Sequence, residues 1–207
     1  MARTVAIGRQ NFETIVGNEG KRVLMAADEI ILREPVMQDG EQVMALRSEI
    51  LESNDGEDAF AGCGGLRGAA SMQEWLDVLE QYKEGGNIPE GGVPSSTYVA
   101  VRKKDGRVVG VIDLRYHINH PILGLWGGHM GFTVRPCERG KGYAKEILRQ
   151  NLLNCRARGM ARVLVTCSET NAASERTILA NGGVYERTVE VDGEKIKRYW
   201  IETTKGE

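Results

Sequence analysis

The sequence predicts one mixed α/β domain, and three features of the chain lead to that prediction. Strand-like and helix-like patterns alternate along most of its length. The Asp-Gly dipeptides at 105–106 and 192–193 each separate two apolar runs, as a hairpin turn does. The apolar run 162–167 follows a helical pattern at 144–158, which is the order of a strand–helix–strand unit with a buried second strand. Such a unit gives a parallel pair of strands through a right-handed crossover.

Size and composition are those of an ordinary folded domain. With 207 residues, 41% of them hydrophobic and 27% charged, the chain can bury a sizeable core without disulfides. The formal net charge of −2 excludes a strongly basic protein that coats nucleic acid, so we expect no nucleic-acid partner. No stretch approaches the roughly 18 apolar residues that a membrane helix needs, so we expect no membrane contact.

The cysteines and the first residues predict a cytoplasmic location. The four cysteines lie far apart and form no CxxC pair, which argues against a zinc ribbon and favours reduced thiols. The N-terminus lacks the apolar segment of a secretory signal.

The first half of the chain reads as an extension followed by a strand, a helix and a loop. Residues 1–27 show no sustained period, so we place the domain at residues 28–204. A strand is expected at 30–32 and a helix over 38–53. Residues 54–70 are rich in Gly, Asp, Glu and Ala, which indicates a long mobile loop that borders a site.

The middle of the chain carries clear start and turn signals. Ser71-Met72-Gln73-Glu74 is a capping box that opens a helix reaching Tyr82, and a Gly/Pro loop follows at 84–96. Two strands, 97–102 and 107–116, form the first hairpin.

The second half alternates between strands and helices. We expect a strand at 128–134, the helix 144–158, the buried strand 162–167 and a helix at 171–180. Two closing strands then meet at the second Asp-Gly turn.

The turn from Val134 into the helix at 144 carries the chemistry. Gly140 and Gly142 remove side chains where backbone must approach a ligand, and the helix that follows aims free amides at the same point. With Arg139 and Lys141 as countercharges the turn suits a pyrophosphate, although a glycine-rich turn can also merely start a helix. It is neither a P-loop nor a Rossmann fingerprint, because glycine follows Lys141 and position 145 is lysine.

The segment Arg139-Gly140-Lys141-Gly142-Tyr143-Ala144, preceded by Val134 and Pro136, resembles the R-G-x-G-x-A loop of the GNAT N-acetyltransferases. Asn171-Ala172-Ala173-Ser174 resembles the N-x-x-[AS] motif of that family. With the stretches 128–136 and 198–201, the chain is similar to one bacterial branch of the family over about residues 28–202.

The resemblance implies a fold and a function. The fold is a mixed, mostly antiparallel sheet of six or seven strands, split at a parallel pair and flanked by helices. The function is direct transfer of the acetyl group of acetyl-CoA to a primary amine of a small molecule, a protein or a peptide. The alternative is a catalytically silent domain that binds acyl-CoA as a sensor or regulator. Dimers are common in the family, so a homodimer is a further expectation.

The resemblance also implies roles for individual residues. The backbone of Phe132, Thr133 and Val134 would pair with the pantetheine arm. Asn171 would bind the pantetheine or fix the splay of the strands, and Ser174 would face the thiol end as a catalytic group. The pyrophosphate would be held by the amides of Arg139, Gly140, Lys141, Gly142, Tyr143 and Ala144.

The sequence offers more than one candidate for the general base and for the general acid. His129 precedes the glycine turn and can take an amine proton, but it can equally be a histidine that only makes hydrogen bonds within the sheet. Water or a carboxylate such as Asp113 or Glu169 is the alternative base.

Many family members place an acid tyrosine seven residues after the motif asparagine, and this chain has Ile178 there. Ser174, a water, Tyr199 or Tyr116 could replace that acid, or the CoA thiolate could leave unassisted.

Two other chemistries are not expected. His117 and His120 have no third ligand nearby in the sequence, so we predict no metal site. Cys137 has no evident His partner, which disfavours a covalent mechanism.

Overall fold

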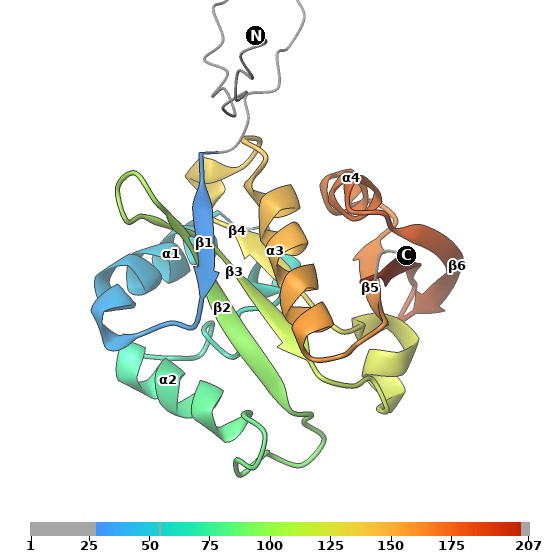
Figure 1. Cartoon of the computed structure of the whole chain (residues 1–207), viewed down its shortest axis with the longest axis horizontal. Helices are drawn as coiled ribbons and strands as arrows, with labels where there is room; N and C mark the ends of the chain where they lie inside the picture. Colours follow the sequence, from blue (N-terminus) through green and yellow to red (C-terminus); the bar gives the residue numbers. More distant parts are fainter. Residues whose placement is uncertain (1–27, 54, 204–207) are drawn as a thin grey trace, which may run out of the picture.

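The computed structural model of the chain describes residues 28–53 and 55–203 (Figure 1). The predicted extension 1–27 lies outside the described residues, so the boundary at residue 28 stays a prediction. The described strands form two sheets, with the orders β1-β2-β3-β4 and β5-β7-β6.

The elements follow the predicted order closely. The first sheet contains β1 (Ile30–Arg33), β2 (Ser95–Arg102), β3 (Val108–Arg115) and β4 (Phe132–Val134). The second contains β5 (Arg162–Ser168), β6 (Val184–Val191) and β7 (Glu194–Glu202). The main helices are α1 (Gly40–Glu52), α2 (Met72–Gln81), α3 (Tyr143–Ala157) and α4 (Ala172–Ala180).

The predicted fold class, a mixed and mostly antiparallel α/β domain flanked by helices, is confirmed. One detail differs. β4 and β5, on the two sides of the split, share no ladder, so every strand pairing among the described residues is antiparallel.

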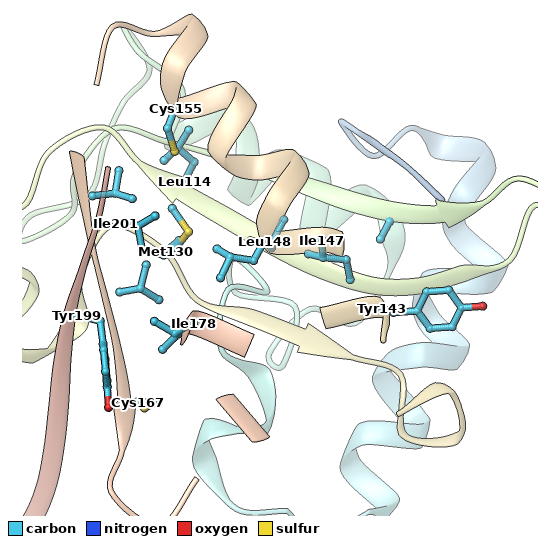
Figure 2. Close-up of a cluster of buried hydrophobic side chains, with 14 of the residues drawn as sticks. Leu114, Met130, Tyr143, Ile147, Leu148, Cys155, Cys167, Ile178, Tyr199 and Ile201 are labelled. Carbon is cyan, nitrogen blue, oxygen red and sulfur yellow. The ribbon is translucent and has the colours of Figure 1, made fainter. Parts of the chain in front are cut away.

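Helices α1 and α2 cover one face of the first sheet and α3 covers the other, while α4 lies beside the second sheet (Figure 1). Side chains of α1 and α2 pack with Val99, Val101 and Val111 of β2 and β3 in one buried cluster. Side chains of α3 and α4 pack with residues of both sheets in a second cluster, which therefore bridges the split. Figure 2 shows Ile147 and Leu148 of α3 in this cluster, with Ile178 and Tyr199 beyond the split.

The loop 54–70, expected to be a mobile segment, is instead packed where its side chains are described. Cys63, Leu66 and Ala69 are buried against α1 and α2. Gly62, with a φ of 73°, lies directly on Gly131, and a Cβ added to it would come within 1.9 Å of the Gly131 carbonyl oxygen. Small residues allow this close approach of two backbones. The loop therefore forms a wall beside β4.

A local sequence signal explains where α2 begins. Ser71 caps α2, since its Oγ accepts the Glu74 N–H at 3.2 Å. The Glu74 carboxylate reaches the N–H of Ala70 at 2.8 Å rather than that of Ser71. Among the described residues, no helix is both long enough and apolar enough to span a bilayer.

Candidate active site

The edge of β4 that faces the split is open. The Asp113 N–H bonds to Gly131 O at 3.1 Å, and the Arg135 N–H bonds to Val109 O at 2.9 Å. In an antiparallel ladder, hydrogen-bonded pairs alternate, so the backbone of Thr133 faces β3 while the N–H and C=O groups of Phe132 and Val134 point away from it. Since β5 does not pair with β4, these groups lie on the open edge.

The predicted strand 128–134 is interrupted before β4. The Gly131 N–H donates to the Oδ1 of Asp113 at 2.6 Å, whereas the Asp113 carbonyl accepts from Asn151 Nδ2 at 3.0 Å. Side chains thus replace part of the ladder. Asn151 was not expected from the sequence, although a polar residue on the buried face of α3 was a signal of such a role.

His129 joins the two sheets at the apex of the split. Its N–H donates to Leu164 O at 2.8 Å, and the Leu164 N–H donates to His129 Nδ1 at 2.8 Å. The imidazole thus accepts the hydrogen bond that a backbone carbonyl would accept in a β-ladder. The two bonds connect the segment just before β4 with strand β5.

The chemistry of the His129 ring follows from these hydrogen bonds. The ring is buried, and desolvation lowers its pKa to about 4, so it is neutral at physiological pH. Because Nδ1 accepts a hydrogen bond, the single ring proton resides on Nε2. Neither nitrogen therefore has a lone pair that is free to accept a proton from an amine.

Two arginines hold the turn that leads to His129. Arg115 Nη1 donates to the carbonyls of Gly127 and Gly128 at 2.8 and 3.1 Å. Arg198 of β7, which is 4% exposed, donates from Nη1 to Gly124 O at 2.7 Å. Arg115 from the first sheet and Arg198 from the second thus hold the segment 124–128 before His129. The sequence did not indicate this role for either arginine.

The glycine turn connects β4 with α3. Gly140 and Gly142 adopt φ values of 76° and 89°, in the left-handed region that other residues rarely enter. Gly142 immediately precedes α3, so the unpaired amides at the start of the helix face the turn. These conformations are what a backbone cradle for a phosphate requires.

The charged side chains of the turn already have partners. Lys141 Nζ lies 2.7 Å from Glu138 Oε2, and Arg139 Nη1 pairs with the carboxylate of Asp55. The hydroxyl of Tyr143 donates to Asp28 at 3.0 Å, and this buried side chain fixes the start of α3. The side chains of Arg139, Lys141 and Tyr143 are therefore engaged within the protein, and it is the backbone of the turn and of the first residues of α3 that is left to bind a ligand.

The two motif residues at α4 contact each other. Asn171 is the N-cap residue, and its Oδ1 accepts the Ser174 N–H at 3.0 Å. Ser174 is half-buried in the first turn. Asn171 thus orients the start of α4.

The tyrosines considered as acids have other partners. Ile178, at the position of the family tyrosine, is buried in the core (Figure 2). The Tyr199 hydroxyl donates to Glu175 Oε1 at 2.5 Å, and burial raises its pKa. The Tyr116 hydroxyl shares a hydrogen bond of 2.6 Å with Ser96.

The remaining candidates have local roles in the structure. His120 Nδ1 accepts the Ile122 N–H at 3.2 Å. The second oxygen of Asp113 lies 2.9 Å from Arg115 Nη2, so both oxygens of this carboxylate have partners. Within residues 28–53 and 55–203 there is no group of three or more His, Cys, Asp or Glu side chains able to hold a metal ion.

An open strand edge that leads into a glycine turn at a helix N-terminus is the geometry expected of a site for an extended ligand that ends in phosphate. The model of the acetyltransferase (GNAT) domain matches residues 29–184, and the chain belongs to this family. The expected family and enzyme class, an acetyltransferase, are thereby confirmed. A search of curated proteins finds no match.

Solved structures share the fold at low sequence identity. Mycobacterium smegmatis RimJ in complex with CoA-disulfide has a TM-score of 0.61 and 20% identity, over 84% of this chain and 81% of its own. Salmonella typhimurium yncA with its cofactor acetyl-CoA has a TM-score of 0.58 and 13% identity, over 86% and 95%. Ribosomal-protein-S5-alanine acetyltransferase from Vibrio fischeri has a TM-score of 0.57 and 15% identity, over 84% and 93%.

Proposed function

We propose that the protein transfers the acetyl group of acetyl-CoA directly to a primary amine of a small molecule, a protein or a peptide. The observation that carries the proposal is the open edge of β4, which continues into the left-handed turn at Gly140 and Gly142. The pantetheine pairs with the outward-facing backbone of Phe132 and Val134, and the amides of residues 140–144 bind the pyrophosphate. The Arg139 N–H is not one of these donors, because it donates to Pro136 O at 3.3 Å. The backbone of Thr133 faces β3 and is not available to the pantetheine. Its side chain contacts the loop wall, since Oγ1 donates to Ala59 O at 2.8 Å.

The reaction is a nucleophilic substitution at the thioester carbonyl. The amine nitrogen forms a bond to the carbonyl carbon, an outward-facing β4 amide stabilises the oxyanion, and the C–S bond then breaks to release CoA thiolate. The amine gives up one proton. A CoA thiol resembles a cysteine thiol of pKa about 8.5, so the thiolate can leave near neutral pH without a strong acid.

Within this proposal, His129 is a positioning residue and the amine proton passes to water. The hydrogen bond that Nδ1 accepts from Leu164 leaves the ring no free acceptor nitrogen. Asp113 is likewise engaged, because one oxygen pairs with Arg115 and the other accepts the Gly131 N–H. Exposed Glu169 remains the alternative base.

The proposed acceptor is a primary amine, either of a small molecule or of a protein or peptide. The Vibrio fischeri structure is named for an acceptor alanine on a ribosomal protein, which favours including peptide amines among the candidates. The free thiols of all four cysteines fit a reducing compartment such as the cytoplasm. A homodimer stays a prediction.

A panel of small-molecule and peptide amines, read by release of free CoA thiol, tests this function. Turnover with at least one amine supports the enzyme. Acetyl-CoA binding without turnover on any amine would favour the acyl-CoA sensor instead.

Acetyl-CoA is expected to raise the melting temperature. A ligand at 100 times its dissociation constant stabilises a fold by about 2.7 kcal/mol, which corresponds to several degrees for a domain of this size. The measurement is a thermal melt with and without millimolar acetyl-CoA, with dephospho-CoA and free adenosine as comparisons. An unchanged melting temperature would reject the donor.

Replacing Ser174 by alanine is expected to lower kcat less than tenfold. The Asn171 cap bonds to the Ser174 backbone amide, so the substitution leaves the cap intact and removes only a hydroxyl. Steady-state kinetics at saturating acetyl-CoA measure the effect. A loss of 100-fold or more would identify Ser174 as the acid that the family tyrosine otherwise supplies.

A further inference from the structure

A buried carboxylate lies beneath the glycine turn. Glu138 is 5% exposed and ends the short helical turn Pro136–Glu138. Its Oε2 accepts hydrogen bonds from Arg102 Nη1 at 3.0 Å and from Lys141 Nζ at 2.7 Å. Its Oε1 lies 3.3 Å from Arg107 Nε. Three cations therefore surround one carboxylate.

The cations connect the turn with a distant part of the fold. Arg102 ends β2 and Arg107 immediately precedes β3, so both belong to the β2–β3 hairpin. Arg102 is itself fixed by Asp105 at 2.9 and 2.7 Å and by the Tyr143 hydroxyl at 3.2 Å. Glu138 thereby ties the glycine turn to a rigid hairpin and to the first residue of α3.

Glu138 is ionised in this setting. Burial raises the pKa of its carboxyl, but Lys141 and Arg102 outweigh that effect and hold the pKa below its usual value. A buried carboxylate is tolerated only where such partners compensate its desolvation.

The turn needs an anchor of this kind. Gly140 and Gly142 are both in left-handed conformations, but glycine adopts other backbone conformations about as readily, and a change of φ at either residue reorients the neighbouring amides. Three side-chain contacts restrict the turn: Arg139 Nε bonds to Val134 O at 3.1 Å, Arg139 Nη1 pairs with Asp55, and Lys141 folds back onto Glu138.

We propose that Glu138 is a positioning residue of the donor site, which holds the turn 139–142 on the β2–β3 hairpin so that its amides converge on the pyrophosphate. The inference rests on the proposed function. It assigns Glu138 to binding of the donor and not to the chemical step.

The test compares Glu138→Gln with Glu146→Gln by steady-state kinetics and by calorimetric titration with CoA. Glu146 lies in the first turn of α3 and pairs with Arg149 on the surface, so its substitution removes the same charge near the same helix end without touching the anchor. Loss of a charge-assisted hydrogen bond costs about tenfold or more in affinity. We expect Glu138→Gln to raise KM and Kd for the donor about tenfold with kcat within twofold, and Glu146→Gln to leave both unchanged.

An unchanged or lowered KM in Glu138→Gln, an equal rise in Glu146→Gln, or a matching fall in kcat would overturn the proposal. If Glu138→Gln does not fold, Arg107→Gln tests the same anchor from its half-exposed side and should raise KM by a smaller factor. Wild-type protein that neither binds nor uses acetyl-CoA would instead reject the proposed function, which separates the two failures.

Discussion

Replacing Gly142 by valine is expected to abolish acetyl-CoA binding. Gly142 has a φ of 89°, and a β-branched residue there pays both backbone strain and the loss of the close approach to phosphate. Strain of this kind costs about 1–3 kcal/mol, so the variant turn relaxes away from the left-handed conformation and binding must overcome that cost again. The valine side chain also obstructs the phosphate, so we expect a loss of at least about 100-fold in affinity. Calorimetric titration with CoA measures the loss, and a thermal melt of the unbound variant verifies that it folds.

Lys141→Ala is the matched control in the same turn. The lysine side chain is 52% exposed, and exposed charges of this kind contribute about 1 kcal/mol or less, so its removal should weaken binding less than tenfold. Equal and mild effects of the two substitutions would show that the pyrophosphate binds elsewhere.

Replacing His129 by alanine is expected to lower kcat about 100-fold, because displacement of reacting groups by about 1 Å can cost that much. The alanine keeps the backbone hydrogen bond to Leu164 O but removes the one that the ring accepts, which leaves the Leu164 N–H without its partner. His129→Asn should recover most of the rate, since its Oδ1 can accept the same hydrogen bond. The pH dependence of kcat should be the same in all three proteins.

A general-base role predicts the opposite outcome. In that case His129→Asn would be as inactive as His129→Ala, and the acidic limb of the pH profile would disappear in both. Steady-state rates from pH 5 to 9 with one fixed amine distinguish the two roles.

The same histidine predicts a pH dependence of stability. Its pKa is about 4 in the folded protein and near 6.5 in an unfolded chain, so the unfolded state binds more protons between these values. The His129 contribution to stability is complete above about pH 6.5 and is lost as the pH falls toward 4. Urea unfolding should show a smaller loss over this range for His129→Asn than for the wild type.

Features that depend only on neighbouring residues could be predicted from the amino-acid sequence. The Asp-Gly turns, the Ser71 cap and the glycine pair before α3 are local, because turn and cap conformations follow from a few adjacent side chains. Hydrophobic periodicity located the helices and β5 for the same reason, since a helix or strand face repeats within a few residues. The family motif is equally local, and it indicated the glycine turn that we propose binds acetyl-CoA.

The roles of the buried polar residues and the packing of the loop beside β4 follow from contacts between residues far apart in the chain. Whether His129 is a base or a hydrogen-bonding residue depends on Leu164, which lies 35 residues away in the sequence. The role of Glu138 depends on Arg102, 36 residues earlier, and the end of β4 depends on the carboxylate of Asp113. Residues 54–70 look mobile in composition, but the described residues 59–62 pack beside β4, because small residues allow two backbones to touch. Each of these outcomes depends on which donor, acceptor or surface the fold brings opposite a given residue, and such long-range pairings leave no periodic or adjacent signal in one sequence.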